Sequence, residues 1–175
     1  MNEMIRVTKG QLVLPQTGDI VLVKNRTFIS YIIRVGEWLR FHKDTWSHVA
    51  VAVDDEGGII EALWDGVHKT NIEKYQHVEY MIVRTSKTIL SSRPDLQQAL
   101  AYLYSQLDKP YGYLTLFGTA TRFLVPGRAF AFIGSHNICS GLAAQSLTRG
   151  YFTPSVQPVT MSPTELAEAL GVDTR

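Results

Sequence analysis

Cysteine is nearly absent from this sequence: one residue, Cys139, stands among 175, so no disulfide can form within the chain. That argues against a small secreted fold held together by disulfides and against a structural zinc site built on several cysteines. An excess of either charge is missing too, because 17 Lys and Arg stand against 16 Asp and Glu. The net charge of +1 leaves no electrostatic footprint for nucleic acid, which we do not expect as a partner.

Long apolar runs are missing as well. No stretch approaches the length of a membrane span, and residues 1–11 carry Glu3, Arg6 and Lys9 without the apolar centre of a signal peptide. We therefore expect a soluble, cytoplasmic protein without a transmembrane segment, and a viral or bacterial origin is compatible with that. At 45% hydrophobic and 19% charged residues, the chain suits a single domain over residues 1–175.

The first half of the chain is rich in strand patterns. β-branched residues after Gly18 predict a first core strand over 18–23. Alternating residues predict a hairpin whose strands, 46–53 and 59–64, are joined by a turn at 54–58. Further strands are predicted over 67–72 and 78–83, so we expect an antiparallel sheet.

Helical patterns dominate the second half, after one amphipathic helix predicted over 27–41. Apolar spacing predicts helices over 93–107 and 113–123. Residues 157–161 are predicted to be extended, and Ser162-Pro163-Thr164-Glu165 is typical of a capping box that opens a last helix. A block of strands followed by a block of helices predicts an α+β fold, with the sheet packed against helices.

The single cysteine stands at the start of another predicted helix. Cys139, Leu142, Ala143 and Leu147 follow helical spacing, and Asn137 is a suitable N-cap that would place Cys139 in the first turn. There the helix dipole favours a thiolate, and unpaired N–H groups can bind an oxyanion. A lone cysteine is most often a small buried apolar residue, so the local pattern leaves both interpretations open.

A thiol hydrolase also needs a base beside the sulfur and a group that orients the base. His48 stands out because it begins a predicted strand, and Glu61 lies in the paired strand across a short turn. The same two residues also fit a surface cross-strand pair. His136 is interpreted as a loop residue. The remaining histidines have polar neighbours and are interpreted as solvated: His42, His68 and His77.

Five short motifs occur in an order that resembles a known family. They are Gly18-Asp19-Ile20-Val21, Ser47-His48-Val49-Ala50, Ile60-Glu61-Ala62, Lys109-Pro110-Tyr111-Gly112 and Ile138-Cys139-Ser140-Gly141-Leu142. The chain resembles the circularly permuted NlpC-type, papain-like amidases and peptidases of the YiiX and YebB kind, in which the histidine strand precedes the cysteine helix. The resemblance runs from Gly18 to Thr164, and it implies a permuted papain-like fold.

The resemblance also implies a function. Cys139 would be the nucleophile that forms an acyl-thioester, His48 the base, and Glu61 the residue that orients His48. Peptides or peptidoglycan fragments are the implied substrates, and a lipid or thioester acyl hydrolase or acyltransferase would use the same residues. A binding or structural module without catalysis is the alternative from a different class. We predict no cofactor and no metal, because the histidines are scattered and zinc needs several close ligands.

Three further residues are assigned to substrate binding. The resemblance implies that Tyr111 lines the site, and Ser47 and Ser140 complete the predicted set. Family members often have an acidic residue at the position of Gly141, so this chain departs from the family pattern in the first turn of the cysteine helix.

Overall fold

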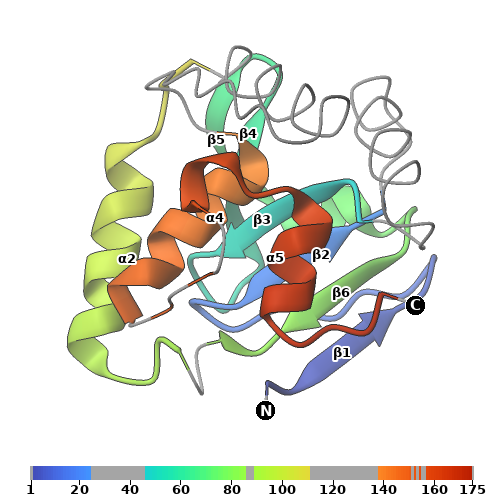
Figure 1. The fold of residues 1–175 in the computed structure, drawn as a ribbon. Coiled ribbons are helices and arrows are strands. Elements are labelled where there is room, and N and C mark those ends of the chain that lie inside the picture. The colour runs from blue at the N-terminus through green and yellow to red at the C-terminus, as the bar shows by residue number, and fades with distance from the viewer. Residues whose placement is uncertain are drawn as a thin grey trace, which may run out of the picture.

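The computed structural model describes residues 2–24, 46–85, 89–110, 138–150, 152, 154 and 157–174. These residues form an α+β fold with one six-stranded sheet and three α-helices (Figure 1). The strands are β1 (Met4–Val7), β2 (Ile20–Val23), β3 (His48–Ala52), β4 (Gly58–Leu63), β5 (Gly66–Asn71) and β6 (Tyr80–Val83). The helices are α2 (Arg93–Ser105), α4 (Cys139–Leu147) and α5 (Pro163–Ala169), and short 3-10 helices are η1 (Ile72–Tyr75), η3 (Thr148–Gly150) and η4 (Pro158–Thr160).

The sheet is antiparallel throughout, in the order β1-β6-β2-β3-β4-β5. This confirms the predicted α+β class and the antiparallel sheet packed against helices. The predicted strands are all present, with ends that differ by two residues at most. Sequence analysis missed β1, an edge strand that pairs with β6 and carries the charged Arg6. The helices predicted over 27–41 and 113–123 lie outside the described residues.

Both faces of the sheet are covered. Residues from α2, α4 and α5 pack on one face, against side chains such as Val49, Val51 and Ile60 (Figure 1). The opposite face packs against η1 and the segment before β2, through Ala50 and Ile59. Apolar side chains on both faces explain why β2 is buried along its whole length.

Helix α4 begins with the cysteine, as predicted, but its N-cap differs from the prediction. Ile138 is the N-cap, with extended backbone angles of φ −90° and ψ 160° and no side-chain hydrogen bond to the helix. The N-cap predicted at Asn137, a residue outside the described ones, is therefore wrong, because Ile138 directly precedes the first helical residue, Cys139. Cys139 still falls in the first turn.

The segment after α4 differs from the prediction in one place and agrees in another. Residues 157–161, predicted to be extended, contain the 3-10 helix η4, with Pro158 at its first position. This turn packs on the start of α4: a Cβ on Gly141 would lie 2.8 Å from the carbonyl oxygen of Val159. A side chain does not fit there, which accounts for glycine at that position. The predicted capping box is present, since Ser162 and Glu165 bond reciprocally at the start of α5.

Candidate active site

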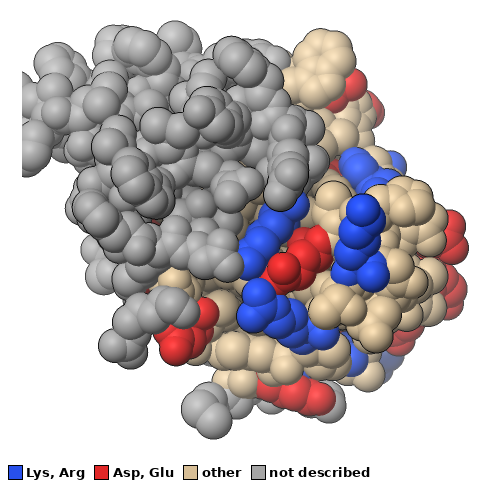
Figure 2. Space-filling model, turned by 90° about the vertical axis from the view of Figure 1, so that its right-hand side faces the viewer, with Lys and Arg blue, Asp and Glu red and all other residues tan. Residues whose placement is uncertain are grey.

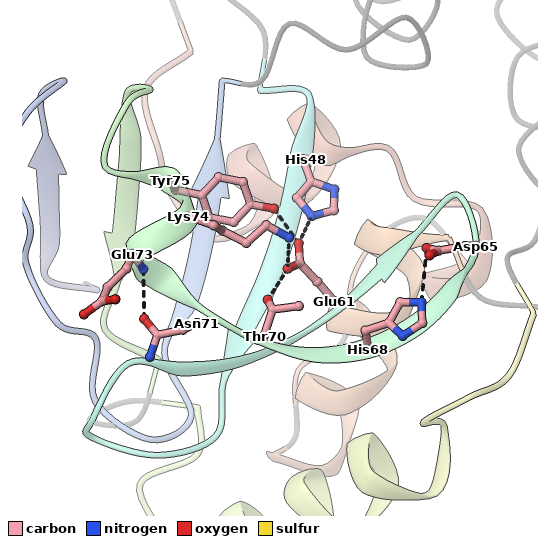
Figure 3. A network of polar contacts seen from close by, with 9 residues as sticks. All are labelled: His48, Glu61, Asp65, His68, Thr70, Asn71, Glu73, Lys74 and Tyr75. Atoms are coloured by element: carbon pink, nitrogen blue, oxygen red, sulfur yellow. Dashed lines mark hydrogen bonds and ion pairs between the residues drawn. The ribbon is translucent and has the colours of Figure 1, made fainter.

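The register of the hairpin places His48 and Glu61 on one face of the sheet. Ala50 lies directly opposite Glu61, and alternation puts His48 on the same face as Ala50. His48 and Glu61 are therefore diagonal neighbours. The His48 Nε2 and Glu61 Oε2 atoms are 2.7 Å apart (Figure 3). The alternative of a surface pair is wrong, because the Glu61 side chain is 0% exposed and the His48 side chain is 11% exposed.

The Glu61 carboxylate contacts four donors from the described residues, two on each oxygen. Oε2 accepts hydrogen bonds from His48 and from the Tyr75 hydroxyl. Oε1 accepts from the Thr70 hydroxyl and from Lys74 Nζ, the latter at 2.7 Å. Figure 3 shows these side chains around the carboxylate. A buried carboxylate with all its acceptor positions used is held in one orientation.

The charges of this cluster follow from these contacts. Burial by itself would raise the pKa of Glu61, but its bonds to His48, Lys74 and Thr70 outweigh burial and hold that pKa well below the usual range. Burial would likewise lower the pKa of His48, yet hydrogen bonds and Coulomb attraction with Cys139 and Glu61 raise it to about 10. Burial and the neighbouring carboxylate raise the pKa of Tyr75, so its hydroxyl remains a donor. At neutral pH the cluster therefore holds a carboxylate beside an imidazolium.

Cys139 is the second partner of His48. The hydrogen bond between the two side chains is among the causes of the raised pKa of His48. Because Glu61 occupies Nε2, Nδ1 is the ring nitrogen that remains for the sulfur. Cys139 is only 4% exposed and packs with the core between the sheet and α4. The N–H groups of the first helical turn have no acceptor within the helix, so they lie beside the sulfur as potential donors.

The predicted substrate-binding residues have different surroundings. The Ser140 hydroxyl is buried and donates to the Met161 carbonyl oxygen at 2.5 Å, which ties α4 to the segment before α5. The Ser47 hydroxyl donates to the Val23 carbonyl oxygen at 3.2 Å. These bonds give both hydroxyls a structural role, and their part in substrate binding stays a prediction. Tyr111 lies outside the described residues.

The other histidines do not join this cluster in the part of the chain that the structure describes. His77 is exposed, as predicted. His68 is half-buried and stands opposite Glu61 in the β4–β5 register, but its ring pairs with Asp65, with Nε2 3.1 Å from Oδ1 (Figure 3). His42 and His136 lie outside the described residues. Among the described residues, no group of three or more His, Cys, Asp or Glu side chains is placed to hold a metal ion.

Sequence analysis missed Thr70, Lys74 and Tyr75. Thr70 stands opposite Ile59, and therefore on the face of Glu61, so a correct register for β5 would have identified it. Lys74 and Tyr75 lie in η1, where neither a strand nor a helix period applies. Their position beside the Glu61 carboxylate depends on how this turn folds back onto the sheet.

The described part of the face in Figure 2 carries charges of both signs. Figure 2 shows basic and acidic side chains interspersed on the face that it presents, and two ion pairs of this kind join Glu79 to Arg6 and to Lys24 at 2.5 and 3.3 Å. Across the described residues, none of the helices combines the length and apolarity that crossing a bilayer requires. No protein-family model matches the chain, and no curated protein matches it in sequence.

Proposed function

We propose that this protein is a cysteine-dependent hydrolase, an amidase or peptidase of the circularly permuted papain-like type. The observation that carries the proposal is the His48 ring, which bonds to Glu61 and to Cys139 at the first turn of α4. Nucleophile, base and orienting group are thus in contact. The chain order, with the histidine strand before the cysteine helix, supports the permuted arrangement.

In this proposal the reaction begins with the Cys139 thiolate, which the adjacent imidazolium stabilises. The sulfur attacks the acyl carbonyl carbon, and the N–H groups of the first turn of α4 bind the resulting oxyanion. Loss of one such donor commonly slows catalysis by about 10²- to 10³-fold. The His48 imidazolium then gives its proton to the leaving amine as the C–N bond breaks. The acyl group remains on Cys139 as a thioester.

Water completes the cycle. Neutral His48 removes a proton from water, and the hydroxide adds to the thioester carbonyl. The C–S bond breaks, the acid is released, and the thiolate and imidazolium pair is restored. Glu61 stays ionised and keeps the His48 ring aligned through both steps, because its contact to Nε2 fixes the ring rotation.

Intact-protein mass spectrometry tests the proposal. The full chain is incubated with peptidoglycan fragments, peptides and acyl lipids, and we expect an adduct with the mass of one acyl group on Cys139. Cys139→Ala should show no adduct. The class of compound that acylates the protein distinguishes an amidase or peptidase from a lipid or thioester acyl hydrolase. Equal binding of a ligand by the wild type and Cys139→Ala, without any adduct, would favour a binding module instead.

A further inference from the structure

We infer that Lys74 and Tyr75 are positioning residues of this site, which fix the Glu61 carboxylate and through it the His48 ring. The inference rests on the proposed function, because it assigns these residues a part in the reactivity of Cys139. It goes beyond the three residues of the proposed site by extending the site to η1, a segment distant from α4 in sequence.

The geometry of the carboxylate is the first argument. A carboxylate bonded through one oxygen can rotate, whereas donors on both oxygens fix its plane. Tyr75 donates to Oε2, the same oxygen that contacts His48, and Lys74 bonds to Oε1 at 2.7 Å. The Tyr75 ring also lies beside the His48 ring, with centroids 6.0 Å apart and planes tilted by 46°. Tyr75 therefore restrains both members of the His48–Glu61 pair.

The charge balance is the second argument. Glu61 is fully buried, and two cationic groups, His48 and Lys74, each approach it to 2.7 Å. If His48 alone compensated this charge, the carboxylate would hold the imidazolium proton more tightly. Lys74 shares the compensation at the other oxygen, and its side chain is 36% exposed, so its own desolvation is limited. The His48 charge is then available to the sulfur of Cys139.

The turn that carries both residues is itself well fixed. The Asn71 side chain caps η1 by accepting a hydrogen bond from the Glu73 N–H at 2.9 Å. The Ile72 N–H donates to the Gly57 carbonyl oxygen at 2.8 Å, which ties the turn to the start of β4. Ile72 and Tyr75 are buried against the sheet. A turn anchored in this way can hold its side chains in place, as positioning requires.

A double-mutant cycle tests whether Lys74 and Tyr75 affect the reactivity of Cys139 through Glu61. The measured quantity is the rate at which iodoacetamide alkylates Cys139 near neutral pH. We expect Lys74→Met and Tyr75→Phe each to slow alkylation by about tenfold, the lower end of the effect seen when groups that orient metal-bound histidines are removed. In a Glu61→Gln background the same changes should have no further effect, because both residues act through Glu61.

Two matched controls come from the same sheet. Lys69 forms a comparable ion pair with Asp54 at 3.1 Å, and Tyr80 is a buried tyrosine whose hydroxyl bonds to Val13. Lys69→Met and Tyr80→Phe should leave the alkylation rate unchanged. Lys74→Arg, which keeps the charge and the donors, should restore most of the wild-type rate. If Lys74→Met does not fold, Lys74→Gln replaces it.

The outcomes separate this inference from the proposed function. Rates unchanged in Lys74→Met and Tyr75→Phe, or slowed equally in both backgrounds, would overturn the positioning role, even if substrates acylate Cys139. Coupling through Glu61 without any acylation of Cys139 would support the positioning role and remove the proposed hydrolase.

Discussion

The change Glu61→Gln removes the negative charge around which the candidate site is arranged. Glu61 is 0% exposed and contacts His48 and Lys74 at 2.7 Å each. Loss of one member of a buried ion pair commonly costs about 3–5 kcal/mol. Because Lys74 is partly exposed and the amide oxygen still accepts hydrogen bonds, we expect a loss near the lower limit, about 3 kcal/mol.

The stability lost in Glu61→Gln should depend on pH, in a direction set by the lowered pKa of Glu61. The contacts of Glu61 hold its pKa below the usual value of 4.5, so the carboxylate stabilises the folded protein above that pH, and the stabilisation is lost as the pH falls. The difference in free energy of unfolding between wild type and Glu61→Gln should therefore have its largest value at pH 6 and shrink below about pH 5. Urea denaturation followed by tryptophan fluorescence at several pH values measures it.

A matched control is Glu79→Gln. Glu79 also has a lowered pKa and two cationic partners, Arg6 and Lys24, but its side chain is 31% exposed. Surface ion pairs contribute about 0–1 kcal/mol, so this change should cost much less than Glu61→Gln. Equal losses for the two variants, or a Glu61→Gln difference that grows as the pH falls, would refute the reasoning.

Three other predictions concern His48 and Gly141. His48→Ala should slow iodoacetamide alkylation of Cys139 near neutral pH more than Glu61→Gln does, because it removes the ring that hydrogen-bonds to the sulfur. The His48 ring should titrate near pH 10 by NMR, and its stabilisation, full below pH 6.5, should be lost as the pH rises toward 10. Gly141→Asp should lower the melting temperature through a cost of about 1–3 kcal/mol, because its Cβ would lie 2.8 Å from the Val159 oxygen.

Much of the candidate site could be predicted because local rules determine it. The short turn between β3 and β4 fixes the register, and the Gly58 N–H donates to Asp54 at 2.5 Å within it. Once the register is fixed, the period of two places His48 and Glu61 on the same face. Helical spacing likewise predicts the helix that carries Cys139, although not its N-cap.

What could not be predicted depends on contacts between distant segments or on weak local preferences. Lys74 reaches Glu61 only because η1 folds back onto the sheet, and no period in the sequence describes that path. The cap of α4 was misplaced because Ile138 makes no side-chain hydrogen bond, so a residue with a better cap propensity was favoured. Pro158 suits both an extended segment and the first position of a turn.

The position of His48 at the end of a strand explains how the site can combine residues from both faces of the sheet. Glu61 faces η1, whereas its neighbours Ile60 and Ala62 pack with Cys139 on the side of α4. A side chain in the middle of β3 points to one face only, and the backbone separates it from the other. His48 is the first residue of β3, so its ring lies at the border of the two faces and contacts the carboxylate and the sulfur together. A base for Cys139 that is oriented by Glu61 therefore belongs at this end of the strand.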